Sequence, residues 1–402
     1  MSAKVLLITN NFPPGFGGSG VVYANLARHA GGRILVLAPR LSYADTLPMI
    51  GWREYDRMAR FRVVRLPLLR TTVGVRRGAK NKAAFMAKDL LIRGRLAWSV
   101  LTLLVHEQIR TVCVGELLAS GWILQLLSYV PGIRTVVYVH GEEITTADPY
   151  DPDFVRRRRA LSAVSKIVVV SRFTQRAVLA LLGEREARRI VLIENGVDTT
   201  RFHPAPRNQE LISRYRLMGQ FVFITVCRLL EKKGVDHALR AFARLLPEHP
   251  ATRYLIVGSG PYEPELRALV AELSIAHAVE FAGSVAEHEL ADHYRLGDVF
   301  VMPNRSLPNG DTEGFGLVFL EANGCGLPVI AGQDGGSVDA VRDDENGLVV
   351  NGHSVPAIYA AMTRLRVDDA LRARLAQLSL LAAGAADWTS RADAFLCTCV
   401  DK

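Results

Sequence analysis

The 402-residue sequence has few of the features that mark secreted, metal-binding or membrane-spanning proteins. Its five cysteines are odd in number and form no Cys-x-x-Cys pair, so neither a disulfide framework nor a zinc site is expected. No apolar run reaches the roughly 20 residues that a membrane-spanning helix needs. The longest candidate, Leu117–Ile133, is interrupted by Gly121, Gln125 and Pro131. No signal-peptide cleavage site is recognisable. These absences favour a reduced, cytoplasmic protein.

The length and composition indicate a globular protein of two domains. A chain this long exceeds one ordinary hydrophobic core and fits two domains of about 200 residues each. Hydrophobic residues at 49% and charged residues at 22% are normal for a soluble enzyme. Aromatic residues are few and do not interleave with basic ones, which disfavours a nucleic-acid-binding role.

The formal net charge of +9 is concentrated locally, with basic residues crowding the segment 76–95. Apolar residues, among them Met86, Leu90, Leu101 and Leu104, recur there at helical spacing. A basic amphipathic helix of this kind can lie on an anionic membrane surface. The alternative is a solvated helix whose apolar stripe packs on its own domain. A second basic run, Arg156–Arg159, offers the same two possibilities.

Apolar strands alternate with helical stretches along the chain, which predicts an α/β protein with parallel sheets. The expected strands are 4–9, 34–38, 62–66, 111–114, 134–139, 166–170, 189–193, 221–226, 252–257, 278–281, 298–302, 328–331 and 347–350. Pro204 and Pro206 break regular structure between the two halves. We therefore expect two doubly wound domains, 1–205 and 206–386, facing across a cleft, with ligands at the carboxyl ends of the strands.

The most informative segment runs from Glu313 to Glu321, with Gly-Phe-Gly between these two carboxylates. It follows an apolar strand and opens into an apolar helix. Gly314 and Gly316 leave the backbone N–H groups of a helix start uncovered, which suits a phosphate or a sugar hydroxyl. Glu313 precedes that helix start, and Glu321 lies about two turns further on. The arrangement indicates a site that holds a nucleotide sugar at two points.

Two cations and a glycine pair follow other strands. Arg228 comes just after the strand 221–226, and Lys233 lies five residues on. Such cations neutralise a diphosphate, the Arg through a planar fork and the Lys as a point charge. Gly17 and Gly18 follow the first strand, where bare backbone can approach a phosphate closely. Each has a plainer alternative: surface cations without a ligand, and a tight turn.

These ordered motifs resemble the retaining GT-B glycosyltransferases of family 4, and most closely its phosphatidylinositol-mannoside-type mannosyltransferases. The resemblance covers almost the whole chain and implies a GT-B fold, with two Rossmann-like domains. It implies an N-terminal acceptor-binding domain and a C-terminal nucleotide-sugar-binding domain. It also implies that a helix within 387–402 crosses back to the N-terminal domain. Cys227 departs from the family pattern, which usually has glycine at that position.

The resemblance also implies roles for individual residues. Arg228 and Lys233, rather than the adjacent Lys232, would bind the diphosphate, and Glu313 and His140 would contact the transferred sugar. Further donor contacts are implied for Gly17, Gly18, Gly314, Phe315, Gly316 and Leu317, for Glu321 at the ribose, and for Val285 at the base. For His140 the alternative is a histidine that merely satisfies local structure, and for Glu321 it is a carboxylate stabilised by the helix dipole.

The implied reaction transfers a hexose from a nucleotide diphosphate to an acceptor hydroxyl with retained configuration, without a metal or another cofactor. The expected donor is GDP-mannose and the expected acceptor is lipid-linked or a polysaccharide, as in glycolipid or polysaccharide biosynthesis. A UDP-hexose donor is the alternative. A nucleotide-sugar epimerase and a non-catalytic nucleotide-sugar-binding protein are further alternatives. The expected location is the cytoplasm, with peripheral attachment to the inner face of the membrane.

Overall fold

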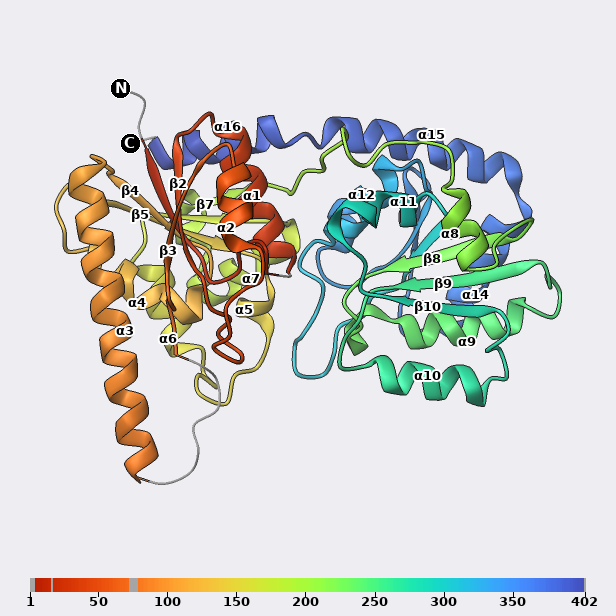
Figure 1. The fold of residues 1–402 in the computed structure, drawn as a ribbon, viewed down its shortest axis with the longest axis horizontal. Helices are drawn as coiled ribbons and strands as arrows, with labels where there is room; N and C mark the ends of the chain where they lie inside the picture. Colours follow the sequence, from red (N-terminus) through yellow and green to blue (C-terminus); the bar gives the residue numbers. More distant parts are fainter. Residues whose placement is uncertain (1–3, 16, 72–78, 401–402) are drawn as a thin grey trace. The chain divides into compact units, whose positions relative to one another are not determined.

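The computed structural model describes residues 4–15, 17–71 and 79–400 and divides into two compact units (Figure 1). The first unit comprises Met1–Val170, Thr174–Ile193 and Trp388–Lys402, and the second comprises Ser171–Phe173 and Glu194–Asp387. Each unit contains one parallel sheet. The two sheets confirm the predicted pair of doubly wound domains.

The first unit contains a parallel sheet in the order β3-β2-β1-β4-β5-β6-β7. Its strands are β1 (Val5–Ile8), β2 (Ile34–Pro39), β3 (Arg62–Leu66), β4 (Thr111–Val114), β5 (Arg134–Val139), β6 (Lys166–Val169) and β7 (Ile190–Leu192). The winding reverses between β1 and β4. Ligands of open α/β sheets bind at such a point, outside the carboxyl ends of the strands.

Helices cover both faces of the first sheet. They are α1 (Gly18–His29), α2 (Trp52–Met58), α3 (Ala79–His106), α4 (Leu117–Leu127), α5 (Glu142–Thr145), α6 (Val155–Ser162), α7 (Arg172–Leu182) and α16 (Trp388–Val400), with the 3-10 turn η1 (Glu184–Arg189). Leu6 and Ile8 of β1 pack with the buried side of α3 and α4 in one core layer. On the other face α16 packs against α1.

The second unit contains a parallel sheet in the order β10-β9-β8-β11-β12-β13. Its strands are β8 (Phe221–Val226), β9 (Thr252–Val257), β10 (Val279–Gly283), β11 (Val299–Met302), β12 (Val329–Gly332) and β13 (Gly347–Val350). The winding reverses between β8 and β11. The loops that follow these two strands carry most of the predicted donor-binding residues.

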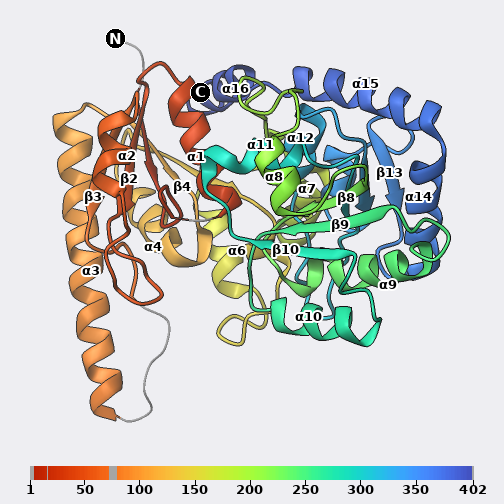
Figure 2. The ribbon, with the colours of Figure 1, turned by 45° about the vertical axis from the view of Figure 1, so that its right-hand side comes forward.

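Helices also cover the second sheet, with α9 and α10 together below it in both views (Figures 1 and 2). They are α8 (Gln209–Arg214), α9 (Val235–Leu245), α10 (Glu263–Glu272), α11 (Leu290–Tyr294), α12 (Leu317–Gly324), α13 (Ser337–Ala340), α14 (Val355–Val367) and α15 (Asp369–Ala385), with the 3-10 turns η2 (Glu231–Lys233) and η3 (Glu287–Glu289). Contacts place α14 beside α9, and α15 beside α12.

The domain division falls at Glu194, earlier than the residue 206 expected from the proline pair. The segment between them packs within the second unit. Phe202 makes an edge-to-face ring contact with Tyr294 of α11, and the backbone N–H of Val197 donates to the carbonyl of Ala386. The prolines interrupt regular structure, but burial of this preceding segment determines where the unit begins.

The basic segment 76–95 leads into α3, although Arg76 and Arg77 lie outside the described residues. In both views the N-terminal half of α3 projects away from the first sheet (Figures 1 and 2). Among the described residues, no helix is long and apolar enough to cross a membrane. The second basic run is partly structural, because the buried Arg157 stacks on Phe154.

Candidate functional site

The reversal point of the second sheet is bridged by an ion pair. The loop after β8 supplies Lys233, whose ammonium group hydrogen-bonds a carboxylate oxygen of Glu313 from the loop after β11. Burial is the largest single influence and opposes ionisation of Glu313, but the charge and hydrogen bond of Lys233, the charge of Lys232 and the Phe315 N–H together lower the pKa of the carboxyl. Glu313 is therefore an anion at neutral pH, held in place by Lys233.

The neighbouring lysine has a different environment. Lys232 is buried, and its Nζ atom lies 2.6 Å from a carboxylate oxygen of Asp311 and 3.3 Å from the carbonyl oxygen of Thr312. These contacts anchor the segment that precedes Glu313. Lys232 is thus a structural residue, which leaves Lys233 as the better placed of the two for a ligand.

Arg228 lies at the start of the same loop and is exposed. Among the described residues it has neither an ion-pair partner nor a hydrogen-bond partner. Its neighbour Cys227 is buried, and burial raises the pKa of that thiol to about 12. Cys227 therefore behaves as a small apolar residue beneath the loop, and Arg228 is the cation that remains open to an anionic ligand.

Helix α12 begins where the sequence predicted a helix start. Gly316 precedes it with φ of 88°, a left-handed conformation that favours glycine, and a Cβ there would lie 2.5 Å from the ring of Phe319. Within the described chain, no side chain caps this N-terminus, so the first backbone N–H groups of the helix have no capping side chain. The ring of Phe315 is buried, and its backbone N–H donates to Glu313.

Gly336, which precedes α13, supports this segment by a backbone hydrogen bond. The backbone N–H of Gly336 donates to the carbonyl oxygen of Glu313 at 2.8 Å. A Cβ at Gly336 would lie 1.9 Å from the carbonyl oxygen of Gly314, so only glycine permits this approach. The Gly336 amide is therefore engaged within the protein and supports the Glu313 segment.

Glu321 sits further along α12 and is half-buried. The hydroxyl of Tyr294 donates to its Oε2 at 2.7 Å. Burial raises the pKa of this carboxyl, although the Tyr294 hydrogen bond opposes the rise. No described residue donates to Oε1, so one oxygen of Glu321 is available for a ligand hydroxyl.

The loops after β9 and β10 adjoin the Arg228 loop. The hydroxyls of Ser259 and Ser284 lie 2.7 Å apart, and the backbone N–H of Leu229 donates to the carbonyl of Ser259 at 3.0 Å. Val285 follows Ser284 and is half-buried. The carboxyl edge of the second sheet thus brings together the loops of Arg228, Lys233, Glu313 and Val285.

The reversal point of the first sheet holds a carboxylate that the sequence reasoning missed. Glu116 follows β4 and accepts hydrogen bonds from the Thr9 hydroxyl at 2.7 Å, the Asn10 backbone at 2.8 Å and the Asn11 backbone at 3.2 Å. Burial raises its pKa, although these donors oppose the rise. The signal that could have identified Glu116 in the sequence is its position just after a strand, beside Gly115.

Gly17 and Gly18 close the loop that Glu116 organises. Helix α1 begins at Gly18, and no side chain of the described chain caps it at Gly17. Both glycines are exposed, and a Cβ at Gly17 would meet nothing within 4 Å. Open backbone at a helix start is consistent with the predicted anion contact. The space around Gly17 would, however, also admit a side chain.

His140 follows β5 in the same unit. Its Nε2 atom lies 2.8 Å from the Tyr23 hydroxyl, and its backbone N–H donates to Glu143 at 2.8 Å. Burial lowers the pKa of His140 to about 4 and raises that of Glu143 to about 7. At neutral pH the imidazole is therefore uncharged, which suits a hydrogen bond to a hydroxyl better than an ion pair.

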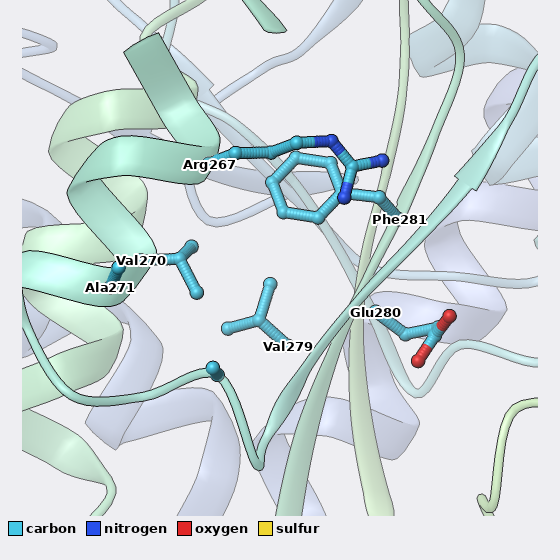
Figure 3. Close-up of a pocket in the computed structure, with 7 residues that line it drawn as sticks. Arg267, Val270, Ala271, Val279, Glu280 and Phe281 are labelled. Carbon is cyan, nitrogen blue, oxygen red and sulfur yellow. The ribbon is translucent and has the colours of Figure 1, made fainter. Parts of the chain in front are cut away.

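Two further features bear on ligand binding. Among the described residues, no group of three or more His, Cys, Asp and Glu side chains is placed to hold a metal ion. A cavity of about 260 Å³ lies between α10 and β10, where Arg267 stacks over Phe281 at 4.4 Å (Figure 3). None of the predicted site residues lines this cavity, so it is distinct from the loop edge described above.

Family models match both halves of the chain. The model "Glycosyl transferases group 1" matches residues 208–379, and "Glycosyltransferase Family 4" matches residues 16–201. The first covers the Arg228 to Glu321 region, and the second covers the Glu116 and His140 region. The two matches agree with the two structural units.

Characterised relatives are similar over most of the chain. The GDP-mannose-dependent alpha-(1-6)-phosphatidylinositol monomannoside mannosyltransferase of Mycobacterium tuberculosis is 32% identical over 372 residues, covering 91% of this chain and 90% of its own. The Corynebacterium glutamicum GDP-mannose-dependent monoacylated alpha-(1-6)-phosphatidylinositol monomannoside mannosyltransferase is 27% identical, covering 92% and 90%.

Solved structures share the fold. Anabaena HepE in complex with UDP and glucose aligns with a TM-score of 0.74 at 18% identity, covering 98% of each chain. Sucrose-phosphate synthase from Thermosynechococcus elongatus aligns with a TM-score of 0.75 at 20% identity, covering 98% of this chain and 97% of its own. At these identities the likeness shows the fold alone.

Proposed function

This chain is a glycosyltransferase of family 4 with the GT-B fold, and on that premise we propose that it transfers mannose from GDP-mannose to a hydroxyl of a glycolipid or polysaccharide acceptor. The observation that carries the proposal is the Lys233–Glu313 pair at the reversal point of the second sheet. Arg228 lies in the same loop as Lys233 and has no hydrogen-bond or ion-pair partner among the described residues. Relatives at 32% identity use GDP-mannose, which supports this donor. A UDP-hexose is the second candidate, because HepE is a structural neighbour that binds UDP.

The charges on these loops suit departure of a nucleoside diphosphate. Arg228, Lys233 and the uncapped start of α12 stabilise the negative charge that develops on the leaving phosphate. We propose that these groups suffice without a metal. Glu313 is bound to Lys233, so it is not free to attack the anomeric carbon as a nucleophile. Its proposed role is to orient a sugar hydroxyl.

We propose that configuration is retained through attack from the face that the diphosphate leaves. The bond between the anomeric carbon and the phosphate oxygen breaks as the acceptor oxygen bonds to that carbon. The acceptor proton passes to the departing phosphate oxygen, which keeps atoms and charge in balance. The protein then contributes positioning and charge stabilisation rather than a covalent intermediate.

A donor panel tests this proposal. Purified protein is assayed with GDP-mannose, UDP-glucose and UDP-galactose, with phosphatidylinositol monomannoside as acceptor and with EDTA in a parallel series. We expect turnover of GDP-mannose, unaffected by EDTA, and an α-linked product by NMR. Arg228→Ala should lower turnover by about 100-fold or more, whereas Arg244→Ala, an exposed arginine on α9, should not. Turnover of a UDP-hexose alone, or near-normal activity of Arg228→Ala, would refute the assignment.

We also propose that α3 attaches the protein to the inner, cytoplasmic face of an anionic membrane. The helix has two apolar stripes. Leu96, Val100 and Leu104 are buried against the first sheet. This stripe therefore packs on its own domain, which was the alternative to membrane binding. A second stripe of large hydrophobic residues remains exposed: Leu90, Leu91, Trp98, Leu101 and Val105.

Basic residues border the exposed stripe of α3. Lys88 and Arg95 are exposed, and at 100° per residue they fall on one side of the stripe. Apolar side chains with a basic border match the surface of an anionic bilayer, where each nearby cation contributes about 1 kcal/mol. Acceptors such as phosphatidylinositol mannosides would lie in that surface.

Vesicle binding tests the attachment. Leu91 of α3 and Leu381 of α15 are 75% and 70% exposed, so each is replaced by Glu as a matched pair. We expect the wild type and Leu381→Glu to co-sediment with phosphatidylglycerol vesicles and not with phosphatidylcholine vesicles. Leu91→Glu should lose most of that binding. Equal binding by the two variants would refute a role for α3.

A further inference from the structure

A buried chain of hydrogen bonds joins the loop after β4 to the loop after β5. The hydroxyl of Tyr23, on α1, donates to the carbonyl oxygen of Gly115 at 2.6 Å. The same hydroxyl lies 2.8 Å from Nε2 of His140. Burial raises the pKa of the Tyr23 phenol well above its usual range, so the hydroxyl keeps its proton.

The donor at each step follows from proton counting. A phenol carries one proton, and the Gly115 carbonyl offers only an acceptor, so the Tyr23 proton lies on that contact. The reverse orientation would leave two bare oxygens 2.6 Å apart in a buried site, which is unfavourable. The Tyr23 oxygen therefore accepts from His140, and Nε2 must carry the imidazole proton.

We propose that Tyr23 is a positioning residue that fixes His140 in the Nε2–H tautomer, so that Nδ1 is a standing acceptor for a hydroxyl of the ligand. The imidazole is uncharged at neutral pH, so Nδ1 then has a free lone pair. Nδ1 has no hydrogen-bond partner among the described residues, and His140 is half-buried. The identity of that hydroxyl as one on a sugar rests on the proposed function.

The surrounding residues keep this geometry. A Cβ at Gly115 would lie 2.6 Å from the Tyr23 ring, so glycine is needed for the hydroxyl to reach its own carbonyl. The His140 ring stacks on Tyr138, with centroids 5.2 Å apart and planes 26° apart. The ring thus has a fixed plane, and the Tyr23 contact decides which nitrogen bears the proton.

Tyr23→Phe and Tyr138→Phe form a matched pair of variants. Both rings contact His140, and both substitutions remove one phenol oxygen. The Tyr138 hydroxyl, however, has no hydrogen-bond partner in the described chain. Protein labelled with ¹⁵N at histidine is studied by NMR without donor, because two- and three-bond ¹⁵N–¹H couplings distinguish the tautomers.

We expect only the Nε2–H tautomer for His140 in the wild type and in Tyr138→Phe. In Tyr23→Phe the Nδ1–H form should appear, and turnover with GDP-mannose should fall about tenfold, the effect of one neutral hydrogen bond. An Nδ1–H resonance in the wild type, or an unchanged tautomer in Tyr23→Phe, would overturn the proposal. If the tautomers are as expected but no nucleotide sugar is turned over by the wild type, the proposed function fails and the positioning role stands.

Discussion

The reversal points of the two sheets hold equivalent carboxylates in opposite electrostatic settings. In the second unit Glu313 bridges two loops by pairing with the cation Lys233, and its pKa is lowered. In the first unit Glu116 bridges two loops through neutral donors, and burial raises its pKa. The same topology thus places one carboxylate beside a cation and the other among neutral hydrogen-bond donors.

The comparison predicts that stability depends more on the counterion of Glu313 in the second unit than on the neutral hydrogen-bond partners of Glu116 in the first. Lys233→Met leaves Glu313 as a buried carboxylate without its counterion. We expect a loss of about 3 kcal/mol or more in the free energy of unfolding and a fall in donor turnover of about 100-fold. Urea unfolding and the GDP-mannose assay measure these two effects.

A double variant separates charge burial from ligand binding. Adding Glu313→Gln to Lys233→Met removes the unpaired charge, so much of the lost stability should return while turnover stays low. If the double variant is as unstable as the single one, the charge of Glu313 is not what Lys233 compensates, and the contrast between the units would be undermined.

In the first unit Glu116→Gln keeps the shape of the side chain and replaces one acceptor oxygen by a donor. That donor would face the N–H groups of Asn10 or Asn11 or the hydroxyl of Thr9. We expect a loss of about 2 kcal/mol in the free energy of unfolding, smaller than for Lys233→Met because no counterion is stranded. A loss equal to or above that of Lys233→Met would contradict the distinction, as judged by urea unfolding at neutral pH.

The two carboxylates also predict pH dependences of opposite sign. Glu313 has a lowered pKa when folded, so the stability it contributes is present above its unfolded pKa of about 4.5 and is lost as pH falls below it. Glu116 has a raised pKa, so its contribution is present below about pH 4.5 and is lost as pH rises. Subtracting the unfolding curves of each Gln variant from the wild type should give slopes of opposite sign; parallel slopes would show that the two environments do not differ.

The same sign rule applies within the first unit to His140 and Glu143. The contribution of His140 to the free energy of unfolding is lost as pH falls from about 6.5 to about 4. The contribution of Glu143 is lost as pH rises from about 4.5 to about 7. Their effects oppose each other around pH 5 to 6, so the wild type should be nearly insensitive there. Glu143→Gln should expose a stability that rises with pH, measured by thermal unfolding. A flat profile in that variant would show that His140 is not shielded from protonation.

The fold was largely predictable because strands and helices leave periodic patterns. Each expected strand is present, since buried parallel strands are short apolar runs between turn residues. The charged residues of the second unit could be named as candidates because Arg228, Lys233 and Glu313 lie in the loops that follow β8 and β11, and because the order of their motifs resembles a known family.

The residues at the reversal point of the first sheet were harder to predict. Glu116 and Tyr23 act through contacts between segments about 100 residues apart, and no local pattern specifies such contacts. The second apolar stripe of α3 was hidden as well, because only the structure separates residues that face the sheet from those that do not. The domain boundary shifted for the same reason, since packing of Phe202 with Tyr294 overrides the proline signal.

The smallest expected effect lies at the edge of the charged site, where the hydroxyls of Ser259 and Ser284 meet at 2.7 Å. Both residues are exposed, so Ser284→Ala should cost less than about 1 kcal/mol of stability. Because this contact holds the loop that leads to Val285, we expect the KM for the donor to rise about two- to fivefold with kcat unchanged. An effect on kcat instead would place this loop at the reacting phosphate, and the charged site would then extend further along the sheet edge than the Lys233–Glu313 pair indicates.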